Sequence, residues 1–184
     1  MGTTYYFLPT RNLFGEGAVK EVGELMNSLD GKKTMIVTDA FLAKSGMAAG
    51  IQEILTAAGV ESVVFDGAEP NPTDLNVEKG LAVFKENNCD SIISLGGGSS
   101  HDCAKGIGLV ASNGGNIRDY EGIDKSHSPM CPMIAINTTA GTASEITRFC
   151  IITDTSRHVK MAIVDWRVTP QIAINDPELM KGMP

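Results

Sequence analysis

The sequence predicts an α/β fold, in which helices flank a parallel β-sheet and short antiparallel strands are added to it. Over residues 18–110, short β-branched runs alternate with helical patterns of roughly 13 to 18 residues, which is typical of right-handed βαβ units. Beyond residue 148 the apolar period changes to two, which is typical of antiparallel strands. With 184 residues, of which 42% are hydrophobic, residues 1–184 are predicted to form a single domain.

The composition narrows the range of partners. The formal net charge of −7 argues against nucleic acid and anionic membrane surfaces, since both require a basic face. No apolar run approaches the roughly 18 residues of a membrane span. The four cysteines show neither C-x-x-C pairing nor zinc-type spacing, and the first residues carry no secretory signal pattern. We therefore expect a cytoplasmic protein with reduced thiols and a small-molecule ligand.

The first part of the chain alternates strands with helices. Strands are expected at residues 5–8, 12–15, 33–39, 60–65 and 92–95, and helices at residues 18–29, 41–58, 73–87 and 99–110. Gly31 and Gly59 end the first two helices, because glycine readily takes the left-handed conformation found after a helix. Thr73 is expected to cap the third helix. The two prolines in residues 67–72 exclude both a helix and a central strand there.

The second part begins with a surface stretch rich in Gly, Asn and Asp at residues 112–124. Further strands are expected at residues 133–137, 149–153, 159–164 and 171–175. The second and third of these are predicted to form a hairpin around a turn at residues 154–157. Asp176 is expected to cap a single helical turn that has Pro177 at its first position.

Polar residues and glycines follow three of the expected strands. Asp39 ends the strand at residues 33–39, Asn71 lies in the loop after the next strand, and three glycines follow residue 95. Ligands of parallel sheets bind beyond the carboxyl ends of the strands. The three strand ends are therefore predicted to converge on one crevice.

The glycines at residues 96–98 are the centre of this prediction. They can take positive φ and present bare N–H groups at the positive end of a helix dipole, so we interpret them as a seat for a diphosphate. The alternative is a tight strand-to-helix turn without a ligand, because neither G-x-G-x-x-G nor the P-loop pattern is present. Ser99, Asp102 and Lys105 behind the glycines favour the ligand. Asp102 and Lys105 share one helical face, where they either hold each other or divide between ribose hydroxyls and phosphate.

Other candidate residues each have a functional and a structural interpretation. Asp39 is either an acceptor for both hydroxyls of an adenosine ribose, which would repel a 2′-phosphate, or a structural carboxylate that caps a helix or lies in a loop. Asn71 is a ligand contact or a turn former, and Lys160 faces the cleft or the solvent. Hydroxyl residues after the strand at 133–137 either bond diphosphate and nicotinamide carboxamide or satisfy backbone groups: Thr138, Thr139, Thr142 and Ser144.

The three histidines do not predict a catalytic or metal site. His101, His127 and His158 are scattered, and no acidic partner lies at metal-ligand spacing. His101 follows the glycines but is expected on the surface of the helix. No catalytic residue and no metal ligand is predicted within this chain.

Four motifs together resemble the iron-containing, group III alcohol dehydrogenase family, most closely its 1,3-propanediol and methanol dehydrogenase branch. They are Gly96-Gly-Gly-Ser-Ser-His-Asp-Cys-Ala-Lys105, Glu69-Pro-Asn-Pro72, Asn137-Thr-Thr-Ala-Gly-Thr-Ala-Ser-Glu145 and Asn175-Asp-Pro-Glu-Leu179. The resemblance implies an N-terminal NAD-binding domain with a Rossmann-like core of six or seven strands. It also implies interconversion of a primary alcohol, such as 1,3-propanediol, and its aldehyde.

The resemblance assigns roles to ten residues. Asp39 would meet the adenosine ribose, Lys160 would lie near the nicotinamide ribose, and Asn71 lies in a matching motif. The glycine motif and the later hydroxyl-rich loop would contact the diphosphate and the nicotinamide side of the cofactor through Gly97, Gly98, Ser99, Asp102, Thr138, Thr139 and Ser144. Ala143 stands where many members have glycine, and we expect this departure to leave the pocket open.

The family's all-helical domain, which holds divalent iron through one Asp and three His side chains, is expected to be missing from this chain. The chain is therefore predicted to be the cofactor half of a two-domain enzyme that is a homo-oligomer at full length, and to be inactive alone. Two alternatives are a non-redox NAD-binding relative similar to dehydroquinate synthase and a non-catalytic fragment that associates with itself through an exposed apolar face.

Overall fold

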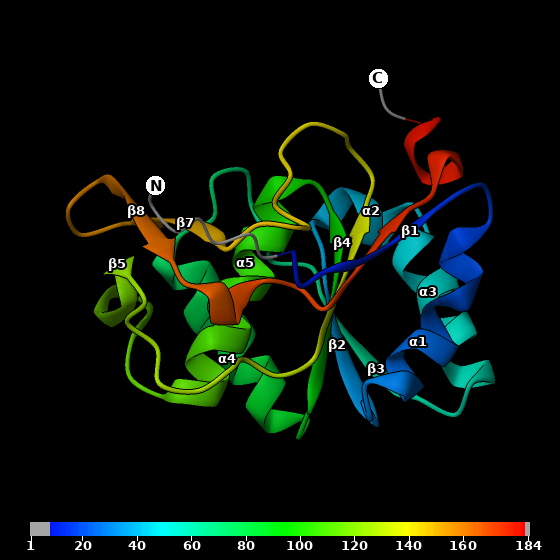
Figure 1. The fold of residues 1–184 in the computed structure, drawn as a ribbon, viewed down its shortest axis with the longest axis horizontal. Coiled ribbons are helices and arrows are strands. Elements are labelled where there is room, and N and C mark those ends of the chain that lie inside the picture. The colour runs from blue at the N-terminus through cyan, green and yellow to red at the C-terminus, as the bar shows by residue number, and fades with distance from the viewer. Residues whose placement is uncertain (1–7, 183–184) are drawn as a thin grey trace, which may run out of the picture.

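The protein is described by a computed structural model that covers residues 8–182. A six-stranded sheet lies between two layers of helices, and a three-stranded sheet lies to one side of it (Figure 1). In spatial order the six strands are β1 (Arg11–Phe14), β9 (Ile172–Asn175), β6 (Met133–Asn137), β4 (Ser91–Gly96), β2 (Lys33–Val37) and β3 (Glu61–Phe65). All neighbouring pairs in this sheet are parallel, so the predicted fold class is confirmed.

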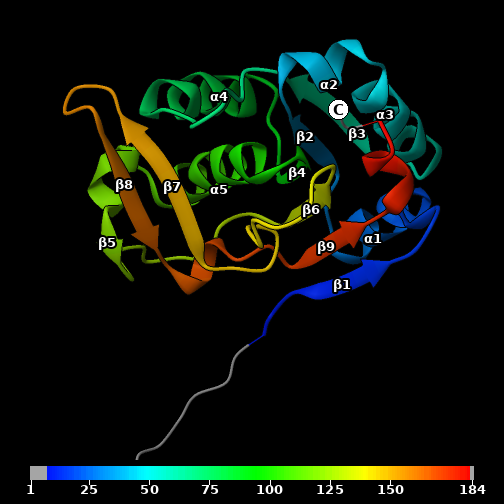
Figure 2. The ribbon, with the colours of Figure 1, turned by 90° about the horizontal axis from the view of Figure 1, so that it is seen from above.

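Helices cover both faces of the sheet. They are α1 (Val22–Ser28), α2 (Ala40–Lys44), α3 (Met47–Ala57), α4 (Asp74–Glu86) and α5 (Gly98–Asn113), with short 3₁₀ turns η1 (Ala18–Glu21), η2 (Ile117–Tyr120), η3 (Trp166–Val168) and η4 (Pro177–Met180). Figure 2 shows α4 and α5 on one face and α1 and α3 on the other. Successive residues of the central strands face opposite cores: Met35 and Val37 join the α5 side, whereas Ile36 joins the α1 and α3 side.

Three predicted helices are found within about three residues of their expected bounds, although the first begins as the 3₁₀ turn η1, and the fourth prediction differs from the structure. Thr73 caps α4 as predicted, because its hydroxyl accepts from the backbone N–H of Asn76 while the Asn76 side chain accepts from the N–H of Thr73. The single helix expected at residues 41–58 is instead α2 and α3, so that prediction was wrong. Gly46, with φ of 88°, separates the two helices, and the apolar spacing that continues past it concealed the break.

The smaller sheet comprises β5 (Gly122–Ile123), β8 (Val159–Val164) and β7 (Phe149–Asp154). The predicted hairpin of β7 and β8 is antiparallel, as expected. β5 was not predicted, because its two residues are too few to show the alternation of apolar and polar side chains typical of a strand. They fall within the surface stretch expected at residues 112–124. This sheet packs on the side of α5 that faces away from the main sheet, so residues 103–110 of α5 are all buried.

The order of the strands creates a switch point. The chain passes from β2 outward to β3 and then returns to place β4 on the other side of β2. Ligands of open α/β sheets bind at such a point, beyond the carboxyl ends of the strands.

Of the strand expected at residues 5–8, residues 5–7 lie outside the described part, and Leu8 belongs to no strand. Within residues 8–182, no helix has both the length and the apolarity needed to cross a bilayer.

Candidate functional site

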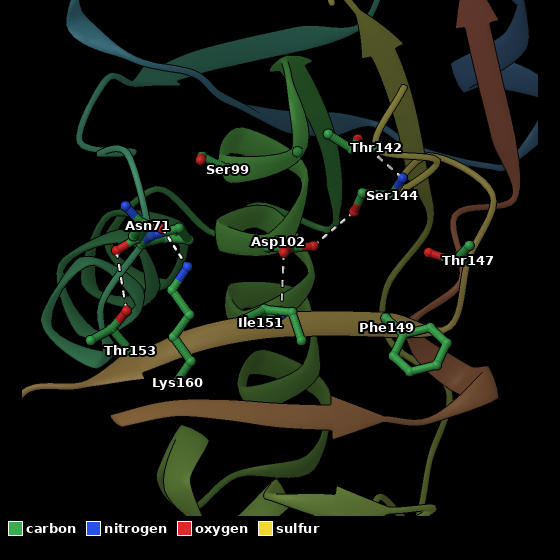
Figure 3. A pocket seen from close by; sticks show the side chains of 12 residues that line it. Asn71, Ser99, Asp102, Thr142, Ser144, Thr147, Phe149, Ile151, Thr153 and Lys160 are labelled. Atoms are coloured by element: carbon green, nitrogen blue, oxygen red, sulfur yellow. Dashed lines mark hydrogen bonds between the residues drawn. The ribbon is translucent and has the colours of Figure 1, made fainter. Parts of the chain in front are cut away.

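Two cavities meet at the turn between β4 and α5. The larger has a volume of about 710 Å³ and begins at Asp39, and the smaller, of about 350 Å³, reaches Asn71 and Lys160 (Figure 3). Gly98 and Ser99 line both cavities. A ligand that fills both must therefore pass over the glycine turn, at the switch point of the sheet.

The structure brings nine of the ten predicted site residues to these two cavities. The larger cavity contains Asp39, Gly97, Gly98, Ser99 and Thr139, and the smaller contains Asn71, Gly98, Ser99, Asp102, Ser144 and Lys160. Thr138 lines an adjoining cavity of about 580 Å³ instead. A cavity of about 770 Å³ lies at the opposite end of the sheet, where Lys33 and Glu61 begin β2 and β3, and is therefore a poorer candidate despite its size.

The glycine turn leaves the first turn of α5 open. Gly96 has φ of 147°, a conformation that a side chain rarely tolerates, and Gly97 is the N-cap residue of α5 and offers no side-chain cap. A Cβ atom on Gly97 would lie 2.5 Å from Thr139 Oγ1, and one on Gly98 would lie 3.0 Å from Thr142 Cγ2. The absence of side chains therefore lets the loop after β6 approach α5. It also leaves unpaired N–H groups that favour an anion at this end of the helix.

Asp39 caps α2. Its Oδ1 accepts from the N–H of Phe41 at 2.8 Å and from the N–H of Leu42 at 2.9 Å. The structural interpretation of this residue is therefore confirmed for one carboxylate oxygen. The ribose interpretation remains a prediction for a side chain that lines the larger cavity.

A buried polar cluster joins α5 to the loop after β6. Ser144 donates to Asp102 Oδ1 at 2.7 Å and accepts from Lys105 Nζ at 3.0 Å. Asp102 also accepts from the N–H of Ile151, as Figure 3 shows, and Lys105 donates to the carbonyls of Thr147 and Phe149. Asp102 and Lys105 therefore act together through Ser144, and Lys105 is fully buried rather than facing a ligand.

Burial is the largest cause of the pKa shifts of Lys105 and Asp102. It lowers the pKa of Lys105 to about 8, although the nearby Asp102 carboxylate opposes this shift. Burial likewise raises the pKa of Asp102, against the effect of Lys105 and of the hydrogen bonds from Ser144 and Ile151. At neutral pH Lys105 is thus still mainly protonated and can fill its three hydrogen bonds.

Asn71 and Lys160 form the far wall of the smaller cavity. Lys160 Nζ donates to Asn71 Oδ1 at 2.7 Å, and Figure 3 shows the two side chains meeting at the rim. Asn71 has φ of 55°, which Asn tolerates better than most residues, so it is a turn former as well as a cavity residue. Lys160 is exposed to solvent and lines the cavity, so both of its sequence interpretations hold.

The loop after β6 has strained backbone. Thr138 donates its N–H to the carbonyl of Gly96, which ties the loop to the glycine turn. Ala143 has φ of 56°, in the left-handed region that disfavours a Cβ atom. This conformation gives a physical reason for glycine at this position and shows that Ala143 is accommodated without closing the cavity.

His101 was predicted on the helix surface, and that prediction was wrong. The ring is completely buried, with Nδ1 at 2.7 Å from Ser94 Oγ and Nε2 at 2.7 Å from Asn137 Oδ1. Asn137 in turn donates to Asn175 Oδ1, so a hydrogen-bonded chain crosses β4, β6 and β9 directly behind the glycine turn. With Asn137 accepting, the proton lies on Nε2, and Nδ1 accepts from Ser94. Burial lowers the pKa of His101 to about 4, against the hydrogen bond with Asn137.

Comparison with known proteins places this geometry among dehydrogenases. The family model described as iron-containing alcohol dehydrogenase matches residues 9–177. Alcohol dehydrogenase 4 of Schizosaccharomyces pombe is 50% identical over 184 residues, which cover all of this chain and 44% of that protein. NAD-dependent methanol dehydrogenase of Bacillus methanolicus is 49% identical over 181 residues, which cover 98% of this chain and 48% of the relative.

A solved structure has the same fold. The crystal structure of a 1,3-propanediol oxidoreductase superposes with a TM-score of 0.96 at 49% sequence identity, covering all of this chain and 48% of that one. The chain thus spans about half the length of the curated relatives that it matches.

Proposed function

This chain belongs to the iron-containing alcohol dehydrogenase family, and we propose that it binds NAD and presents the nicotinamide for hydride exchange with a primary alcohol or its aldehyde. The observation that carries the proposal is the pair of cavities that share the glycine turn. A dinucleotide consists of two bulky ends joined by a diphosphate, which matches two cavities joined at a helix N-terminus. The names of the relatives, among them an NAD-dependent methanol dehydrogenase, support the same assignment.

The residues divide between the two ends of the cofactor. Asp39 in the larger cavity would accept hydroxyls of the adenosine ribose, and Gly97, Gly98 and Ser99 would hold the diphosphate. The smaller cavity would hold the nicotinamide end, with Lys160 at its rim. When bound, NAD⁺ would supply the hydride acceptor, so that oxidation of a primary alcohol would give the aldehyde, NADH and one proton released to water. The buried polar cluster of Asp102, Lys105 and Ser144 would hold the loop after β6 in place, so that the smaller cavity is formed before the cofactor enters.

The described residues do not fit a metal site. Within residues 8–182, no group of three or more His, Cys, Asp or Glu side chains is placed to hold a metal ion. The family is described as iron-containing, but these residues offer no set of side chains that would hold the iron. On this basis we propose that the chain alone binds NAD but does not oxidise alcohol. Metal-dependent oxidation of 1,3-propanediol by the pure chain would contradict this second statement.

The experiment that tests NAD binding is a titration with NADH and NADPH, followed by nicotinamide fluorescence and by energy transfer from Trp166. We expect saturable NADH binding that is at least tenfold tighter than NADPH binding, because the Asp39 carboxylate would repel a 2′-phosphate. Asp39→Ser is the informative variant, since serine also caps helices but carries no charge. It should remove most of the preference for NADH.

A charge-matched control separates Asp39 from a general electrostatic effect. Glu86→Gln also removes one negative charge but lies on the exposed end of α4, so it should leave the preference unchanged. Binding of neither cofactor by the wild-type chain would refute the proposed function. Equal affinities for NADH and NADPH would refute the proposed role of Asp39 but not the proposal that the chain binds a dinucleotide.

A further inference from the structure

Phe41 is an aromatic residue at an unusual place. It lies in the first turn of α2, and 72% of its surface is exposed, which leaves a large apolar ring in water. The same residue lines the cavity of about 710 Å³ and the adjoining cavity of about 580 Å³. Phe41 therefore stands between two hollows at the end of the site that contains Asp39.

The position of Phe41 is fixed relative to Asp39. The backbone N–H of Phe41 donates to Asp39 Oδ1 at 2.8 Å, so the carboxylate and the aromatic residue belong to one capped turn. In the proposed function Asp39 accepts the hydroxyls of a ribose. The base attached to that ribose must then lie within a few bond lengths of the same turn, where Phe41 is the exposed flat surface.

The surroundings favour a flat, uncharged group over an ion. Leu42, Met47 and Leu179 line the adjoining cavity beside Phe41. Asp66 and Glu69 line the larger cavity, where they would oppose a second anionic group. A purine has an apolar face that stacks on aromatic rings and a polar edge that can remain in water.

We propose that Phe41 is the stacking surface for the adenine ring of the cofactor and so determines affinity for its adenosine half. This inference rests on the proposed NAD-binding function and adds a residue to it. Because stacking reads the face of the base and not its edge, the contribution of Phe41 should require an aromatic ring but tolerate a change in the ring's substituents.

The test compares ligands with and without adenine. NADH, ADP-ribose and reduced nicotinamide mononucleotide are titrated into the wild-type chain and into Phe41→Ala, Phe41→Tyr and Phe14→Ala. Phe41→Ala should weaken NADH and ADP-ribose about tenfold and leave the mononucleotide unchanged, since stacking of one base contributes on the order of a tenfold effect or more. Phe41→Tyr should stay within about twofold of wild type, because the ring is retained.

Phe14 is the matched control. It is 77% exposed on the edge strand β1, and it lines none of the cavities discussed above, so Phe14→Ala should leave all three affinities unchanged. Urea unfolding of both alanine variants checks that each remains folded. Unchanged ADP-ribose affinity in folded Phe41→Ala would overturn this inference while leaving NAD binding intact. A wild-type chain that binds neither NADH nor ADP-ribose would overturn the proposed function and this inference together.

Discussion

Acidification should destabilise this protein through His101 before its carboxylates are protonated. The folded state holds His101 neutral, because the ring is buried and both ring nitrogens are already engaged with Ser94 and Asn137. Its pKa falls from an ordinary value of 6.5 to about 4 on folding. Between these two values the unfolded chain binds a proton that the folded chain does not, so the contribution of His101 to stability is lost as the pH falls from 6.5 to 4 and is constant above that range.

The size of this loss follows from the shift. Each pKa unit corresponds to about 1.4 kcal/mol, so full protonation of the unfolded histidine should remove about 3 kcal/mol of unfolding free energy. Carboxylates such as Asp154, whose pKa is lowered by hydrogen bonds from Ser156 and Arg157, destabilise the fold only at lower pH. Asp102 has the opposite effect on the pH dependence of stability: burial raises its pKa on folding, so its protonation favours the folded state as the pH falls.

The assay is urea unfolding at intervals between pH 7 and pH 4.5 for the wild type and His101→Gln. The variant should be less stable at pH 7, because it disturbs the buried hydrogen-bonded chain, but the difference should shrink steadily as the pH falls. Asp102 and the other carboxylates contribute equally to both proteins, so the comparison isolates His101. Parallel curves for the two proteins across this range would refute the assignment of His101 as a buried neutral histidine.

Two substitutions test the cluster and the loop that shape the smaller cavity. Lys105→Met should lower the unfolding free energy by about 3 to 5 kcal/mol, because it leaves Asp102 and two carbonyls without their partner in a buried site, whereas Lys79→Met at an exposed position of α4 should change it by less than about 0.5 kcal/mol. A loss below about 1 kcal/mol for Lys105→Met in urea unfolding would contradict the anchoring role. Ala143→Gly should raise stability by up to about 1 kcal/mol, because residue 143 has positive φ, whereas Ala82→Gly at an exposed position of α4 should lower it by a similar amount. Calorimetric melting of both variants decides this, and destabilisation by Ala143→Gly would show that the left-handed conformation carries no strain.

Local patterns were sufficient where local interactions decide the structure. The cap at Thr73 depends on a residue three positions away, and the hairpin of β7 and β8 depends on a short turn. The glycine turn was found because its function requires an unusual backbone, which only glycine supplies readily. The role of Asp39 could not be decided from the sequence, because a carboxylate at this position suits both a helix cap and a ribose contact. The structure shows the cap directly.

Long-range packing explains the error at His101 and the unpredicted role of Lys105. α5 lies between two sheets, and only the pairing of strands distant in sequence reveals that its second face is covered. His101 was therefore assigned to the helix surface, although its ring forms hydrogen bonds with Ser94 within β4 and with Asn137 at the end of β6. Lys105 was considered a possible phosphate contact because it is a cation close to the glycine turn. Its three hydrogen-bond acceptors instead lie in residues 144–149, which no local sequence pattern connects to it. Buried polar networks of this kind depend on tertiary geometry.

Backbone amide NMR of the chain titrated with NADH tests the claim that a dinucleotide lies over the turn between β4 and α5. The largest chemical-shift changes should fall on the N–H groups of Gly97, Gly98 and Ser99, with smaller changes at Asp39 and Thr139. Shifts confined to the cavity at the amino ends of β2 and β3, around Lys33 and Glu61, would contradict the claim.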